Sequence, residues 1–146
     1  EILIGLVGSE MCIRDRCFHF AAALPKELGQ PKEGEQPAAF IILCTEGPET
    51  PWTGIDIGIA VRTMNLNAYI HGVGSCIIGN VEFEKAKEIL SIPETWIPRL
   101  ALALGYPSHK STIVELPEDG SVKYYLDEER QYYVPKRKRK DISIIR

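Results

Sequence analysis

The stretch Trp52–Gly79, WTGIDIGIAVRTMNLNAYIHGVGSCIIG, decides the fold, because it joins a long helical pattern to a turn and a short apolar segment. From Trp52 to His71, apolar residues recur at helical spacing on two adjoining faces. Such a wide apolar surface predicts a long helix that is mostly buried. Gly72 suits the left-handed position that ends a helix, and Ser75–Ile78 follows as the short apolar segment.

The turn after this helix carries a Gly72-Val73-Gly74 pattern that could suggest a phosphate-binding loop. A dinucleotide fingerprint requires its glycines after a strand and before a helix. Here they follow a predicted helix, so a helix end and tight turn is the better interpretation. Cys76 could be a nucleophile, but no nearby base is indicated, and a small buried residue is the favoured interpretation.

Elements on either side of this stretch indicate a layered domain. The apolar runs Ala38–Thr45 and Leu100–Leu104 predict buried strands. Phe83–Leu90 has the pattern of an amphipathic surface helix, and Cys17–Leu24 that of a helix end stopped by Pro25. Buried strands separated by helices indicate an α+β or α/β domain.

The C-terminal part contains a turn signal and a basic cluster. A turn signal at Pro117–Gly120 lies between two strand-like segments, Thr112–Leu116 and Val122–Leu126. This pattern predicts a hairpin. Pro135 suits the first position of a helix and precedes five basic residues, Lys136–Lys140. A bound phosphate would stabilise cations at a helix start. The alternative interpretations of this basic cluster are a solvated tail and a nucleic-acid patch.

Residues 1–16 are expected not to derive from the protein's gene. Leu6–Arg16, LVGSEMCIRDR, matches the translation of a common sequencing-library adapter over eleven consecutive residues. A natural helix or strand is the alternative. We therefore expect two parts, an adapter-derived segment over residues 1–16 and a domain over residues 17–146 whose natural N-terminus lies upstream.

Composition excludes several function classes. Hydrophobic residues make up 45% and charged residues 25%, as in ordinary globular proteins, and the net charge of −3 gives no general attraction to nucleic acid or anionic membranes. No apolar run could span a bilayer. The four cysteines form no C-x-x-C pair and the three histidines show no ligand spacing, so we expect no metal site and a reducing, cytoplasmic setting.

Taken together, Trp52–Gly79 resembles the central helix and following turn of the nitroreductase family. The family pattern is an Asp-x-Gly-x-Ala start, an Asn-containing helix, and Gly-Leu-Gly-Ser/Gly-Cys before an apolar pair. The matching residues here are Asp56–Ala60, Asn65 and Gly72–Gly79. Further matches follow in family order at Leu90–Pro93, Leu102–Pro107, Tyr124–Asp127 and Val134–Arg137, so the resemblance covers nearly all of residues 17–146.

This resemblance implies an α+β, three-layer fold with a central mixed, mainly antiparallel sheet and a long buried helix, truncated at its N-terminus. Family members are homodimers that bind FMN at the subunit interface. NAD(P)H reduces the flavin, which then reduces a nitroaromatic, quinone or similar small-molecule acceptor. By analogy, Cys76, Ile77, Ile78 and Gly79 would border the flavin ring through main-chain groups, and Lys136 and Arg137 would bind the FMN phosphate.

The resemblance implies no catalytic acid or base from this chain, because the flavin carries the hydride chemistry. Two other functions remain as alternatives: a non-catalytic flavin-binding or interaction module with the same fold, and a nucleic-acid binder that uses the basic tail. The acidic balance and the few clustered aromatic residues argue against nucleic acid.

Overall fold

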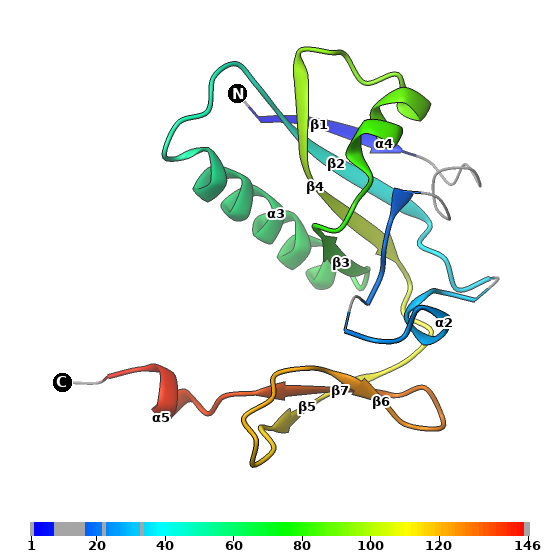
Figure 1. Ribbon diagram of the computed structural model, residues 1–146, viewed down its shortest axis with the longest axis vertical. Helices are drawn as coiled ribbons and strands as arrows, with labels where there is room; N and C mark the ends of the chain where they lie inside the picture. Colours follow the sequence, from blue (N-terminus) through cyan, green and yellow to red (C-terminus); the bar gives the residue numbers. More distant parts are fainter. Residues whose placement is uncertain (1, 8–16, 22, 33, 145–146) are drawn as a thin grey trace. The chain divides into compact units, whose positions relative to one another are not determined.

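The computed structural model describes residues 2–7, 17–21, 23–32 and 34–144. The chain divides into two compact units. Figure 1 labels the helices and strands of both. The first unit consists of residues 1–20 and 30–107, and the second consists of residues 21–29 and 108–146.

The first unit is built on a four-stranded sheet. Its strands, in spatial order, are β1 (Ile2–Val7), β2 (Ala39–Glu46), β4 (Trp96–Gly105) and β3 (Gly74–Ile78). All three neighbouring pairs are antiparallel. The predicted strands over Ala38–Thr45 and Leu100–Leu104 are thus confirmed as β2 and the second half of β4, which begins four residues earlier than its apolar run.

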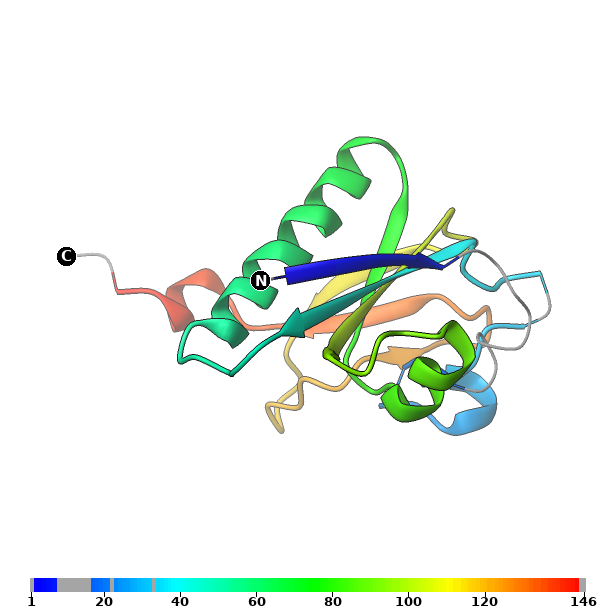
Figure 2. The ribbon, with the colours of Figure 1, turned by 90° about the horizontal axis from the view of Figure 1, so that it is seen from above.

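Side chains that alternate along β2 and β4 give this sheet two apolar faces, as the period of two in a strand requires. One face packs against α3 (Thr53–Ile70), and the other against α4 (Phe83–Leu90) and Phe18. Figure 2 shows these two helices on opposite sides of the strands. The three-layer α+β prediction is therefore confirmed. The core on the α3 face is formed by Leu43, Ile57, Val61 and Leu102, and that on the α4 face includes Phe40, Ile42, Cys44, Ala86, Ala101 and Ala103.

The long helix α3 has nearly the predicted limits but not the predicted burial. Only Ile57 and Val61 are buried, whereas Ile59 is 62% exposed and Ile70 is 77% exposed. The expectation of a mostly buried helix is wrong for this chain by itself. The reason is that the helix has apolar residues on two opposite sides, while the sheet covers only one of them.

The segment before residue 20 also differs from the prediction. The helix end expected over Cys17–Leu24 is wrong, because Phe18 instead forms an antiparallel bridge with Val81 and stacks on Phe40, with ring centroids 4.1 Å apart. Burial of this ring, which is 1% exposed, favours the extended conformation. Two main-chain hydrogen bonds flank the bridge, from His19 N to the Asn80 oxygen and from Glu82 N to the Cys17 oxygen.

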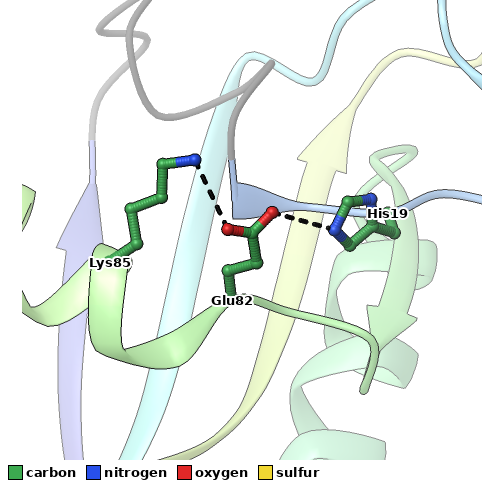
Figure 3. A network of polar contacts seen from close by, with 3 residues as sticks. All are labelled: His19, Glu82 and Lys85. Atoms are coloured by element: carbon green, nitrogen blue, oxygen red, sulfur yellow. Dashed lines mark hydrogen bonds and ion pairs between the residues drawn. The ribbon is translucent and has the colours of Figure 1, made fainter.

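Charged side chains reinforce this bridge at the surface (Figure 3). The Glu82 carboxylate contacts His19 Nε2 at 3.2 Å and accepts a hydrogen bond from Lys85 Nζ at 3.4 Å. The Lys85 ammonium, followed by His19, lowers the pKa of the Glu82 carboxyl. The network therefore ties the segment that carries His19 to the start of α4.

Strand β1 falls within the segment that resembles an adapter. Its backbone pairs with β2 along its whole length, from Ile2 opposite Thr45 to Val7 opposite Phe40. Residues 8–16 lie outside the described residues. Ile2–Val7 thus forms a strand, which is one of the natural structures considered as the alternative to an adapter origin. The adapter origin of residues 1–16 stays a prediction.

The second unit contains a three-stranded sheet. The central strand β7 (Tyr132–Lys136) pairs in parallel with β5 (Ser111–Glu115) and antiparallel with β6 (Tyr125–Leu126). Two single-turn helices, α2 (Lys26–Gly29) and α5 (Arg139–Ile142), complete the unit. The turn at Pro117–Gly120 forms, with a hydrogen bond from Gly120 N to the Pro117 oxygen. The predicted hairpin is nevertheless wrong, because β7 lies between β5 and β6.

Candidate functional site

Strand β3 carries the first group of predicted site residues, Cys76, Ile77 and Ile78, and Gly79 follows it directly. The strand pairs with β4 on one side, from Gly74 opposite Gly105 to Ile78 opposite Ala101. It ends the order of the sheet, so among the described strands it has no partner on its other side. An edge strand presents main-chain N–H and C=O groups outward. This segment can therefore offer main-chain hydrogen bonds to a planar ligand.

The turn before β3 is shaped by its glycines. Gly72 has φ +73°, and Val73 N donates to the Ala68 oxygen at 2.9 Å, so the predicted helix end is confirmed. At Gly74 a side chain would be crowded, since an added Cβ would lie 3.0 Å from the Gly105 oxygen and 3.0 Å from Pro107 Cδ. The glycine thus allows β3 to start directly against the end of β4.

A polar contact fixes β3 to the long helix. Asn65 Nδ2, on α3, donates to Ser75 Oγ at 2.8 Å, and Asn65 Oδ1 accepts a hydrogen bond from Arg62 Nη1. The Asn65–Ser75 contact is partly buried, so its loss would leave polar groups poorly solvated. The family motif includes Asn65 but does not predict that it contacts Ser75, because strand register decides which residue of β3 faces the helix.

The side chains of β3 point to alternate faces. Ile78 is buried against the α4 side, whereas Ile77 is 41% exposed. Cys76 is exposed, so its predicted burial is wrong: it lies on an edge strand that no further element covers within the described part of the chain. Nearby protein still removes enough water from its thiol to raise the pKa of Cys76, which disfavours the nucleophilic thiolate.

The second group of predicted residues lies at the end of β7. Lys136 is its last residue, Arg137 follows, and both are exposed. The prediction that Pro135 starts a helix is wrong. Pro135 is a buried strand residue opposite Val114, and α5 begins only at Arg139. The backbone pairing of β7 continues through Pro135, so the positive charge here comes from side chains rather than from a helix N-terminus.

An acidic residue accompanies these cations. Glu115, the last residue of β5, is opposite Lys136 in the parallel ladder. Its carboxylate lies 2.9 Å from Lys138 Nζ and raises the pKa of that lysine. Neither Lys136 nor Arg137 has an ion pair with any described residue. The structure thus groups Cys76–Gly79 in the first unit and Lys136–Arg137 in the second.

The histidines do not gather into a site. His19 contacts Glu82, His71 ends α3, and the His109 ring lies 4.4 Å from that of Tyr132. In the described ranges, no group of three His, Cys, Asp or Glu residues could hold a metal ion. None of the helices described combines the length and apolar character that a membrane crossing requires.

One charged group escaped the sequence analysis. Arg99 Nε donates to the Thr45 hydroxyl at 2.9 Å, and Nη1 pairs with Glu49. Its Nη2 atom is buried and has no hydrogen-bond partner among the described residues. The signal in the sequence is a single arginine directly before the apolar run of β4, with a threonine ending that of β2.

Comparison with known proteins gives a consistent family. The model of the nitroreductase family matches residues 19–106, more than half of the chain. A protein of Bacillus subtilis (strain 168) described as FMN reductase (NADPH) is 36% identical over 59 residues, which cover 39% of this chain and 24% of that protein.

Solved structures agree on the fold. The hypothetical oxidoreductase YcnD from Bacillus subtilis has a TM-score of 0.56 and 20% identity, over 88% of this chain and 59% of that one. A nitroreductase family protein from Clostridium difficile 630 has a TM-score of 0.54 and 17% identity, over 73% and 60%. The match therefore spans about a quarter of this curated relative and about three fifths of these two structures.

Proposed function

Because the chain belongs to the nitroreductase family, we propose that it is part of an FMN-dependent oxidoreductase. Its substrates would be a reduced nicotinamide, NADH or NADPH, and a nitroaromatic, quinone or similar small-molecule acceptor. The observation that carries the proposal is the family match over residues 19–106, which contains all of α3 and β3. A relative described as an FMN reductase (NADPH) supports both cofactors.

The edge of β3 fits the ring end of FMN. A flavin ring is planar and has hydrogen-bonding groups along one side, and the main chain of Cys76, Ile77, Ile78 and Gly79 offers outward N–H and C=O groups. The turn at Gly72–Gly74 and the Asn65–Ser75 hydrogen bond hold this edge in place. We therefore assign to β3 the role of orienting the ring.

The end of β7 fits the phosphate end. Lys136 and Arg137 are exposed cations, and an arginine can bind two phosphate oxygens at once. Loss of the predicted helix N-terminus removes one argument for an anion here, but the side-chain charges remain. We assign to these two residues the role of binding the phosphate monoester.

When bound, FMN supplies the hydride chemistry. The chain's contribution is then to position and polarise, through main-chain dipoles around Ile77 and side-chain cations past Pro135. Neither the His19–Glu82 contact nor the Cys76 thiol is needed as an acid, a base or a nucleophile. This division of labour is compatible with the raised pKa of Cys76.

We further propose that two copies of the protein form a dimer through α3. The residues Ile55, Ile59, Leu66 and Ile70 are all exposed, and their spacing places them on the side of the helix opposite the buried Ile57. An exposed apolar stripe of this kind marks an interface. A partner on this stripe would account for a helix with apolar residues on the side away from the sheet.

The setting we propose is the cytoplasm, where a reduced thiol such as Cys44 or Cys76 persists. Nothing in the described surface favours nucleic acid over FMN phosphate as the anion at Lys136 and Arg137, and the overall charge of −3 opposes a polyanion.

The test requires the protein in its natural form, with the sequence before residue 17 determined by an independent nucleotide read. We expect a yellow protein that binds FMN and oxidises NADH or NADPH in the presence of a quinone or nitro acceptor. Flavin binding without turnover would support the non-catalytic module instead. A colourless protein that gains no flavin absorbance on addition of FMN would refute both.

A further inference from the structure

A carboxylate, that of Glu115, lies on the strand next to the segment proposed to bind phosphate. Glu115 ends β5 and Lys136 ends β7, and the two residues are direct partners in a parallel ladder. Neighbouring strands lie about 4.8 Å apart, so partner side chains leave the sheet close together and on the same side. Glu115 and Lys136 therefore project from the same side of the sheet, although no ion pair joins them in the described part of the chain.

The same carboxylate is bound to a second cation. Lys138 Nζ lies 2.9 Å from Glu115 Oε2, although Glu115 is 74% exposed and Lys138 is 50% exposed. The backbone at Lys138 is extended, with φ −66° and ψ 146°. Alternate residues of an extended chain share a side, which puts Lys136 and Lys138 on the same side of the chain.

We propose that Glu115 is a built-in counter-anion of this segment, which occupies Lys138 beside Lys136 and weakens their binding of a phosphate monoester until it is displaced. The inference rests on the proposed function, because it concerns the same phosphate site. Lys138 then becomes a further phosphate-binding residue, available once Glu115 gives way. The remaining described acid near the cluster, Asp141, lies in α5 and acts on Lys138 only at longer range.

Electrostatics sets the size of the effect. A phosphate monoester carries nearly two negative charges, so an adjacent carboxylate repels it more strongly than it would a single anion. In water at physiological salt, an exposed charge next to the bound phosphate changes the affinity for the phosphate monoester by roughly threefold. Exposed ion pairs contribute little to folding, so Glu115→Gln should leave the structure intact.

The experiment measures binding of FMN, riboflavin and inorganic phosphate to the full protein and to Glu115→Gln. Glu118→Gln is the matched control, since Glu118 is an exposed glutamate in the turn that follows β5 and has no ion pair with a described residue. We expect Glu115→Gln to tighten FMN and phosphate about threefold, more at low salt, and to leave riboflavin unchanged. Glu118→Gln should bind all three ligands like the parent.

Two outcomes overturn the inference, and they differ in what else they affect. If the parent prefers FMN to riboflavin but Glu115→Gln does not tighten FMN, the counter-anion role fails while the phosphate site stands. If neither protein distinguishes FMN from riboflavin, and inorganic phosphate binds neither, the phosphate site itself fails.

Discussion

Gly74 lies where β3 begins, against the Gly105 carbonyl oxygen and the Pro107 ring. A backbone oxygen moves aside less easily than a flexible side chain, so a Cβ here would require the neighbouring atoms to shift by a few tenths of an ångström. The sequence suggested a tight turn here but no reason for the second glycine, because Gly105 and Pro107 lie 31 and 33 residues further along the chain.

Replacement of this glycine should destabilise the first unit. We expect Gly74→Ala to lower the free energy of unfolding by about 1–3 kcal/mol, the usual cost of overpacking. Gly54→Ala is the control, because a Cβ at Gly54 meets no atom within 4 Å and alanine favours a helix. Urea unfolding measures both variants, and equal stability of Gly74→Ala and the parent would contradict the crowding.

The charge network around Glu82 predicts a pH dependence. Because contacts with Lys85 and His19 lower the pKa of Glu82 below its ordinary value of 4.5, the folded protein holds this carboxylate ionised more firmly than the unfolded chain does. The resulting stabilisation is present above the ordinary pKa and is lost as the pH falls through the lowered pKa.

We therefore expect the stability of the parent to fall more steeply in acid than that of Glu82→Gln. Glu84→Gln, an exposed glutamate on the same helix, should behave like the parent. Urea unfolding at a series of acid pH values provides the measurement. Parallel curves for the parent and Glu82→Gln would show that the contacts in Figure 3 do not form in solution.

Among the elements, α3 and β3 are joined by a partly buried hydrogen bond from Asn65 to Ser75. A double-mutant cycle with Asn65→Ala and Ser75→Ala should give a coupling energy of about 0.5–1.5 kcal/mol in urea unfolding. A cycle with Asn67→Ala, an exposed asparagine on the same helix, in place of Asn65→Ala should give no coupling. Additive effects of Asn65→Ala and Ser75→Ala would mean that the contact does not hold β3.

Local patterns predicted β2, α3 and α4 well, because period, capping glycine and flanking turns all act within a few residues. The helix end at Cys17–Leu24 and the hairpin around Pro117–Gly120 were wrong for a different reason. The conformation at Phe18 is decided by its stacking on Phe40, and that of β5 by its pairing with β7. Both partners are distant in sequence. The same holds for Pro135, whose place in β7 depends on its pairing with Val114.

For the molecule as a whole, the apolar stripe on α3 predicts self-association. We expect Ile59→Lys to convert a dimer into a monomer, because it would bury a charge in an apolar interface. Ile113→Lys is the control, since Ile113 is 73% exposed and lies on β5, outside the stripe. Sedimentation equilibrium measures the mass, and a parent that is already monomeric at all concentrations would contradict the proposed dimer.

The overall fold was predictable only through the family resemblance, since strands and helices by themselves left α+β and α/β architectures open. Order and spacing of motifs from Asp56 to Pro107 led to the family that the match over residues 19–106 confirms. The candidate site was predictable as two segments, Cys76–Gly79 and Lys136–Arg137. The proposed counter-anion was not, because Glu115 is brought opposite Lys136 and into contact with Lys138 by strand pairing rather than by sequence proximity.

We propose that the cations past Pro135 bind the phosphate of FMN, and that the main chain of β3 borders the ring of a flavin. The most direct measurement compares the affinities of FMN and riboflavin for the parent, for Lys136→Ala/Arg137→Ala, and for Lys123→Ala as control. We predict that the parent prefers FMN on the order of tenfold or more, that the double variant loses this preference while still binding riboflavin, and that the control keeps it. An undiminished preference for FMN in Lys136→Ala/Arg137→Ala would contradict the claim.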